Sequence, residues 1–326
     1  MMAAGLIALV VSGICALCMG QFKIPVNAVV AELKGLGSDI PNAHNVIFQV
    51  RLPRVLLSML AGAGLSAAGI SFQCMFANPM ATPDTLGTAN GASFGAALGI
   101  LMGFSSTGIQ VIALLFGIMA VFLVFAVTKR SNGQARSLIM IILAGMVVSS
   151  MFQAMVSMTK YVADPQDQLP AITFWLMGSF STVSRKSLYI GAPFIIAGTL
   201  IIYLLRFRLN SLSLSEDEAR ALGINLPLVR GLVIIAAATV TASVVSICGV
   251  IGWVGLLVPH ITRMVLGNDN RRTVPACIVY GALFMVAVDT IARCATKSEI
   301  PVSILTSVVG APVFILLLRK TGGIKA

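Results

Sequence analysis

The chain has 326 residues, of which 58% are hydrophobic and 10% are charged, and its mean hydropathy is +0.98. A soluble domain carries about 25% charged residues, so this composition excludes a water-soluble enzyme and a disordered chain. The net charge of +11 does not indicate nucleic-acid binding, because the 22 Lys and Arg residues are dispersed between apolar runs. The composition predicts an all-α polytopic membrane protein embedded in the lipid bilayer.

The apolar runs predict about ten membrane spans. Crossing ~30 Å of hydrocarbon takes about 20 helical residues. The two longest apolar runs are broken by glycine-rich segments at 103–108 and 249–255. The predicted spans are 3–20, 55–76, 91–104, 109–128, 137–160, 188–206, 231–249, 254–266, 274–292 and 302–319. We expect them to form a single transmembrane domain over residues 1–326.

The distribution of basic residues predicts the orientation. With the N-terminus in the cytoplasm, inner loops and the C-terminus hold thirteen of the 22 Lys and Arg residues, and outer segments hold nine. Because cytoplasmic loops are enriched in Lys and Arg, we expect both termini in the cytoplasm. The first apolar run lacks the basic leader and the cleavage site of a signal peptide, so we interpret it as a span.

Two connections are predicted to contain short helices. The outer connection, residues 22–50, has apolar residues spaced along one helical face, which favours a helix on the membrane surface. These residues are Val26, Val29, Val30, Leu33 and Leu36. The inner connection, residues 206–230, is the most polar stretch of the chain. There Ser215 can cap a helix, three acidic residues at 216–218 suit its first turn, and Gly223 can end it.

Two features of the spans allow a structural and a functional interpretation. The third span has a glycine every four residues, which favours close helix packing over a direct role in a pore. These glycines are Gly91, Gly95, Gly99 and Gly103. Two prolines four residues apart interrupt the chain at 78–84. This segment is either an ordinary cytoplasmic turn or a constriction beside a translocation path, since irregular backbone at membrane depth needs a cavity.

Charged residues lie at the outer ends of two spans. Asp289 and Arg293 are four residues apart, which predicts an ion pair on one helical face. Arg51 and Arg54 either anchor the second span at the membrane surface or offer a docking patch to an acidic partner.

No catalytic or metal-binding arrangement is evident. The six cysteines, including Cys15 and Cys18, fall mostly in apolar segments and are expected to fill the core. The second histidine, His44, lies in the outer connection, so His260 has no histidine cluster and is expected to be structural and hydrogen-bonded. Without a nucleophile and base pattern, the chain is not expected to be an enzyme or to bind a cofactor.

Seven strings, in order along the chain, together resemble one family. They are RLPR at 51–54, NPMA at 78–81, LAG at 143–145, FWLMGS at 174–179, EARALG at 218–223, GLLVPHITR at 255–263 and GAP at 310–312. The chain is similar to permease subunits of the iron-chelate and vitamin B12 (FecCD/BtuC-like) branch of ABC importers. The likeness runs from about residue 45 to the C-terminus.

The resemblance implies the type II importer fold, with ten spans, in the cytoplasmic membrane of a prokaryote. It also implies a homo- or heterodimer with a second permease subunit, two ATPase subunits that bind ATP and Mg, and an extracytoplasmic binding protein. Docking of that protein would fall on Arg51, Arg54 and Arg293. Coupling to the ATPase would fall on Glu216, Glu218, Ala219, Arg220, Leu222, Gly223, Asp269 and Arg271. The gate of the pathway would fall on Asn78, Pro79 and Met80.

Two departures from the family pattern bear on these roles. Asn270 replaces a common histidine in the GNDNR string at 267–271, and Met80 replaces a common leucine. The implied substrate is a metal chelate, meaning a ferric siderophore, haem or a cobalamin, and molybdate or tungstate is the alternative. A gradient-driven secondary transporter is the alternative from another class, but it would need acidic residues inside the membrane, where only Asp289 comes close.

Overall fold

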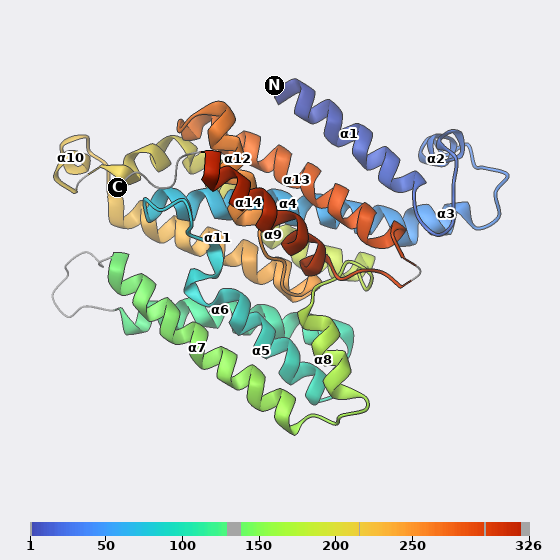
Figure 1. The fold of residues 1–326 in the computed structure, drawn as a ribbon, viewed down its shortest axis with the longest axis horizontal. Helices are drawn as coiled ribbons and strands as arrows, with labels where there is room; N and C mark the ends of the chain where they lie inside the picture. The colour runs from blue at the N-terminus through green and yellow to red at the C-terminus, as the bar shows by residue number, and fades with distance from the viewer. Residues whose placement is uncertain (1, 129–137, 215, 297, 321–326) are drawn as a thin grey trace.

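The computed structural model describes residues 2–128, 138–214, 216–296 and 298–320. Over these residues the protein is helical and contains no strand (Figure 1). This confirms the all-helical prediction, and the apolar helices make the chain a multi-pass membrane protein.

The first half of the chain contains α1 Met2–Cys18, α2 Val26–Leu33, α3 Ala43–Asn45, the π-helical turn η1 Val46–Arg51, α4 Leu52–Met75, the 3₁₀ turn η2 Pro83–Leu86, α5 Thr88–Leu101, α6 Ser106–Val127 and α7 Leu138–Val162. The second half contains α8 Gln168–Leu176, α9 Arg185–Leu209, the 3₁₀ turn η3 Asn210–Ser213, α10 Glu216–Ala221, α11 Leu226–Cys248, α12 Val254–Leu266, α13 Asn270–Cys294 and α14 Val302–Lys320.

Every predicted span coincides with a helix, and the predicted breaks at 103–108 and 249–255 separate α5 from α6 and α11 from α12. Six helical segments of the described chain are long and apolar enough to cross a membrane. They are Ala43–Met75, Ser106–Val127, Leu138–Val162, Arg185–Leu212, Leu226–Cys248 and Asn270–Cys294. Helices α1, α12 and α14 are shorter apolar helices and α5 has 14 residues, so the number of ten spans is not confirmed.

The connections gather at two opposite ends of the bundle. In Figure 1, α10 lies at one end, and α2, α3 and α8 lie at the other. This grouping agrees with the predicted inner and outer connections. The side of the membrane that each end faces stays a prediction. We call the first the α10 end and the second the α2 end.

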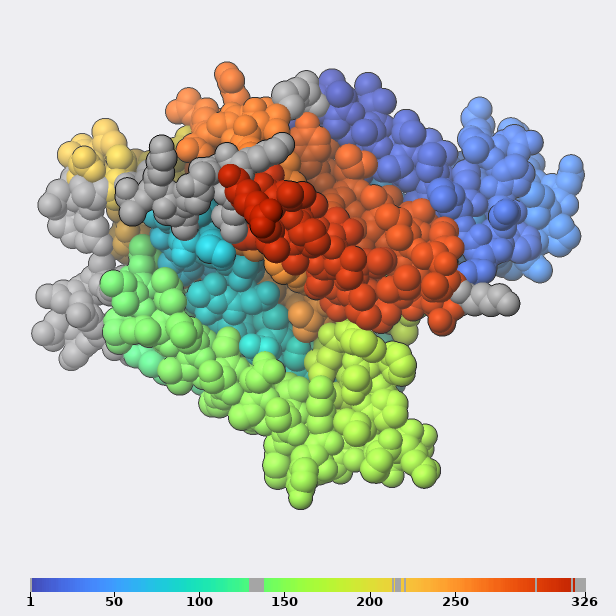
Figure 2. Space-filling view, viewed as in Figure 1, coloured from blue at the N-terminus to red at the C-terminus, as the bar shows by residue number. Residues whose placement is uncertain are grey.

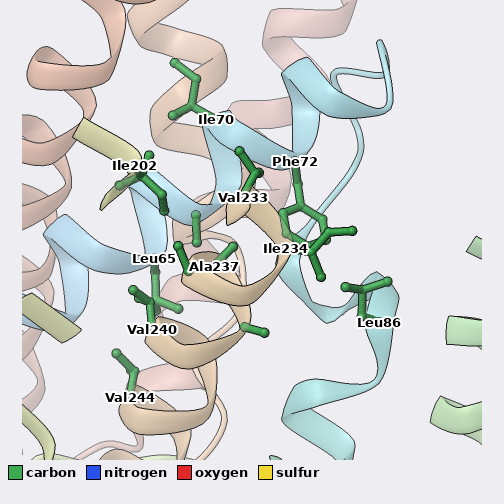
Figure 3. Close-up of a cluster of buried hydrophobic side chains, with 14 of the residues drawn as sticks. Leu65, Ile70, Phe72, Leu86, Ile202, Val233, Ile234, Ala237, Val240 and Val244 are labelled. Carbon is green, nitrogen blue, oxygen red and sulfur yellow. The ribbon is translucent and has the colours of Figure 1, made fainter. Parts of the chain in front are cut away.

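Helices α4 and α11 form the centre of the bundle. Leu65, Ile70 and Phe72 of α4 are buried with Val233 and Val240 of α11 (Figure 3). Neighbouring backbones also touch α4 directly through glycines. A Cβ at Gly69 would lie 1.9 Å from Gly255 O on α12, and a Cβ at Gly62 would lie 2.1 Å from Gly281 O on α13. Such contacts between small residues hold helices together in a membrane.

The glycine row of α5 faces α6, with one exception. A Cβ at Gly91 would lie 2.6 Å from Phe116 O, and one at Gly95 would lie 2.7 Å from Ile112 O. Gly99 is also close to α6, at 3.3 Å from Ile109. Gly103 lies beyond the end of α5, with φ +70° and open space around it, so it does not belong to the packing row. It reverses the chain between α5 and α6 instead.

The connections at the α2 end differ partly from the expectation. Helix α2 forms as predicted, but it ends at Leu33, and Leu36 lies outside it with 77% of its surface exposed. Helix α8 was not predicted. Its signal was the apolar spacing of Leu169, Ile172 and Leu176, which pack in one cluster with α5. At nine residues, α8 is too short to stand out from a polar connection by hydropathy.

Candidate functional site

A buried ionic cluster lies at the α2 end. The Arg54 guanidinium donates to both carboxylate oxygens of Asp289. Oδ1 lies 2.8 Å from Nη2 and 2.9 Å from Nε, and Oδ2 lies 3.2 Å from Nε. Its Nη1 also donates to Glu299, 2.7 Å from Oε1. The Arg54 and Asp289 side chains are 7% and 1% exposed, whereas Glu299 is 35% exposed. The predicted pair of Asp289 with Arg293 is wrong, because α4 supplies Arg54 to that carboxylate.

Two further arginines of this end, Arg51 and Arg293, hold the C-terminus of α1. Arg51 Nη1 donates to Leu17 O at 2.7 Å and Cys18 O at 3.2 Å, and Nη2 donates to Phe22 O. Arg293 Nη2 donates to Ala16 O. The last carbonyls of a helix lack partners within it and carry partial negative charge, so cations stabilise them.

These contacts correct the expectation that Arg51, Arg54 and Arg293 present charge on the outer surface. Each is only 5–6% exposed, and each guanidinium donates to groups of the same chain. Docking of a partner at this end stays a prediction. Arg185 is an exposed arginine here, and it donates to Phe48 O at 3.0 Å.

The predicted coupling helix is present as α10 at the opposite end. The bonds from Leu222 N to Glu218 O (3.2 Å) and from Ile224 N to Ala219 O (2.9 Å) close its last turn. Gly223 adopts φ +69°, the left-handed conformation that commonly ends a helix. Ala219 is buried, while Leu222 is 66% exposed and can meet a partner. The predicted cap Ser215 and the side chains of Glu216 and Arg220 lie outside the described residues.

The second predicted coupling segment begins α13. Asp269 caps this helix by accepting from Arg271 N at 3.0 Å, and it accepts from Asn210 Nδ2 at 2.9 Å. These two hydrogen bonds lower the pKa of Asp269, since both favour the charged carboxylate. The Arg271 guanidinium lies 5.3 Å from the centre of the Phe207 ring. Sequence reasoning missed Asn210, because a single polar residue after a span carries no signal.

The interrupted segment after α4 forms a tight turn. Asn78 Oδ1 accepts from Met80 N at 2.9 Å, Ala77 adopts φ +47°, and Pro83 begins η2. Met80 is 49% exposed. This turn borders a cavity of about 310 Å³ at the α10 end. Asn78 and Pro79 line the cavity together with Gln73, Cys74, Ala77, Leu209, Asn210, Arg263, Asn268 and Asn270. The candidate gate therefore adjoins both candidate coupling segments.

A second cavity, of about 360 Å³, lies at the α2 end. Its lining includes the aromatic residues Phe174 and Trp175 of α8, Ser179 and Ser181, and Glu299 and Pro301. Figure 2 shows α7 and α14 on one face of the molecule, with the cyan part of the chain that follows α4 between them.

The described residues hold no group of three or more His, Cys, Asp or Glu side chains that could bind a metal ion. His260 differs from its prediction. Its Nε2 is buried without a hydrogen-bond partner, and its ring packs at 5.6 Å against Phe314. It is a packing residue of α12.

Comparison with known proteins gives a consistent result. The sequence model of the FecCD transport family matches residues 8–320. A molybdate import system permease protein, MolB of Haemophilus influenzae, is 40% identical over 96% of this chain and 93% of its own. A probable iron chelatin transport system permease protein of Helicobacter pylori is 36% identical over 88% and 86%. A solved structure, described as an inward-facing metal-chelate type ABC transporter, is 38% identical with a TM-score of 0.89 and 98% coverage of both chains.

Proposed function

Because the chain belongs to the FecCD transport family of ABC transporter permeases, we propose that it forms the membrane pathway of an ATP-driven importer. In this proposal the chain sits in the cytoplasmic membrane of a prokaryote, with both termini and the α10 end in the cytoplasm. It works as a dimer with a second permease subunit, and the pathway follows the dimer axis. The chain itself hydrolyses nothing, since two partner ATPase subunits bind ATP and Mg.

One structural observation supports this proposal in addition to the membership of the family. The turn at Asn78 and Pro79 borders the same cavity as Asn210 and Asn270, which belong to the two candidate coupling segments. An ATPase that moves these segments would therefore act directly beside the gate. In this proposal Leu222, which is 66% exposed on the polar connection, contacts the partner ATPase.

The proposed cargo is a metal chelate, namely a ferric siderophore, haem or a cobalamin. This class agrees with the names of the Helicobacter pylori relative and the solved structure. Molybdate or tungstate is the second candidate, and the 40% identity to MolB favours it.

A binding protein would deliver the cargo to the α2 end. In the proposal Arg51, Arg54 and Arg293 fix the shape of that surface from within, because they are buried. Exposed cations such as Arg185 would meet acidic groups of the partner. Arg185→Glu should then weaken docking at low salt more than Arg206→Glu, a reversal at the opposite end of α9.

The test is ATPase activity in proteoliposomes that contain the chain, its partner ATPase and its binding protein. The panel is a ferric siderophore, haem, cobalamin, molybdate and tungstate. Stimulation by one loaded binding protein would support the proposal and identify the cargo. Gly223→Pro should abolish the last turn of α10 and uncouple the complex, so that ATP is still hydrolysed but the cargo is not imported. Failure of an ATPase to associate with the chain would overturn the proposal.

A further inference from the structure

Asn210 connects two segments that are about 60 residues apart in the sequence. It lies where α9 ends and the polar connection to α10 begins. Its Nδ2 donates to Asp269 Oδ1 at 2.9 Å, and its Oδ1 accepts from Asn270 N at 3.0 Å. The amide thus uses both of its polar ends to bind the start of α13. We call Asn210, Asp269 and Asn270 the amide clamp.

The clamp continues to the last turn of α4. Asn270 is 5% exposed, and its Oδ1 accepts from Cys74 Sγ at 3.2 Å. Cys74 Sγ also lies 3.4 Å from a guanidinium nitrogen of Arg263, and that nitrogen donates to Ile70 O at 3.3 Å. Cys74 belongs to α4 and precedes the Asn78 turn by four residues. An uninterrupted set of polar contacts therefore runs from the end of α9 to the last turn of α4, four residues before the gate segment.

Packing at this point differs from packing elsewhere along α4. At Gly62 and Gly69, backbones of neighbouring helices touch α4 and leave no room for a methyl group. At Cys74, α4 borders the cavity of about 310 Å³ instead. Closely packed surfaces transmit a displacement through contact, but a cavity does not. Beside the cavity, the amide clamp directly connects the coupling segments to the end of α4 through polar contacts.

The strongest bond of the clamp involves a charged group. The Asn210 amide donates to a carboxylate whose pKa it helps to lower, so Asp269 is ionised at neutral pH. A hydrogen bond to an ionised acceptor is roughly twice as strong as a neutral one. Placing a second carboxylate at position 210 would replace this attraction with repulsion.

We propose that Asn210 is a positioning residue that makes the two ATPase-facing segments move as one unit with the gate-bearing end of α4. This inference rests on the proposed function. In transport, movement of α10 by the ATPase would reach α13 and the Asn78 turn through the clamp. Without the clamp, the ATPase would still hydrolyse ATP on the assembled complex, but the gate would not follow.

An exchange of the two polar groups tests the clamp in the assembled complex. Asn210→Asp should lower the amount of cargo imported per ATP hydrolysed at least tenfold, with ATPase activity retained. Adding Asp269→Asn restores an amide–carboxylate pair in the reverse direction, and an amide at 269 can still cap α13. The double variant should therefore recover most of the coupling ratio. Asn268→Ala is the matched control, since Asn268 lines the same cavity and should leave the ratio unchanged.

A second measurement needs only the purified chain. Maleimide labelling of Cys74, followed by peptide mass spectrometry, reports how open the cavity is. Asn210→Asp should label several-fold faster than the unchanged chain, and the double variant should return to the original rate. Equal labelling of all three proteins, or equal loss of ATPase and uptake in both variants, would overturn the clamp. Labelling that changes as expected in a chain that recruits no ATPase would instead overturn the proposed function alone.

Discussion

Removal of Arg54 should destabilise the protein strongly. In Arg54→Met, the Asp289 carboxyl group stays at 1% exposure but loses its hydrogen bonds to the guanidinium. Leaving one partner of a buried pair uncompensated costs about 3–5 kcal/mol. Glu299 adds at most about 1 kcal/mol, since a third of its side chain is exposed. A loss of about 4 kcal/mol lowers the ratio of folded to unfolded protein by roughly a factor of 10³.

Denaturant unfolding in detergent micelles measures this loss. Arg54→Met with Asp289→Asn removes both charges and should recover about 2 kcal/mol or more, because a buried neutral amide costs less than a buried carboxylate. Arg185→Met is the matched control, since Arg185 lies at the same end of the molecule but is exposed and donates to the backbone carbonyl of Phe48. If Arg54→Met destabilises no more than this control, the account of the ionic cluster is refuted.

Three further predictions concern glycines and pH. Gly95→Val should cost about 1–3 kcal/mol, because a Cβ there meets Ile112 O at 2.7 Å and forces α5 away from α6. Gly103→Ala has open space and should cost only about 1 kcal/mol for the left-handed backbone, so the reverse order in thermal melts would contradict the packing assignment. Hydrogen bonds from Ser38 and His44 lower the pKa of Glu32, so stability of the α2 segment is present above about pH 4.3 and is lost as the pH falls through the lowered folded pKa. Hydrogen exchange of residues 26–46 should show this loss, and Glu32→Gln should remove the pH dependence.

Features within one stretch of sequence were predictable. Long apolar runs located the helices, glycine-rich breaks located the turns after α5 and α11, and the acidic start and Gly223 located α10. The bonding of the arginines was not predictable. Arg54 binds a residue 235 positions away, and hydropathy shows only that a charge lies near the end of a span. The same limit hid Asn210, whose partners lie 59 and 60 positions away.

The two arginines at the end of α1 also bear on how the protein is made. Arg293 reaches Ala16 across 277 residues of chain. At about 5–20 residues per second of synthesis, the first helix emerges roughly 15–55 s before this arginine. During that interval the carbonyl of Ala16 has no access to its final partner. Arg51, which follows Leu17 by 34 residues, can hold the end of α1 early, whereas the contact of Ala16 with Arg293 forms only after α13 has been made.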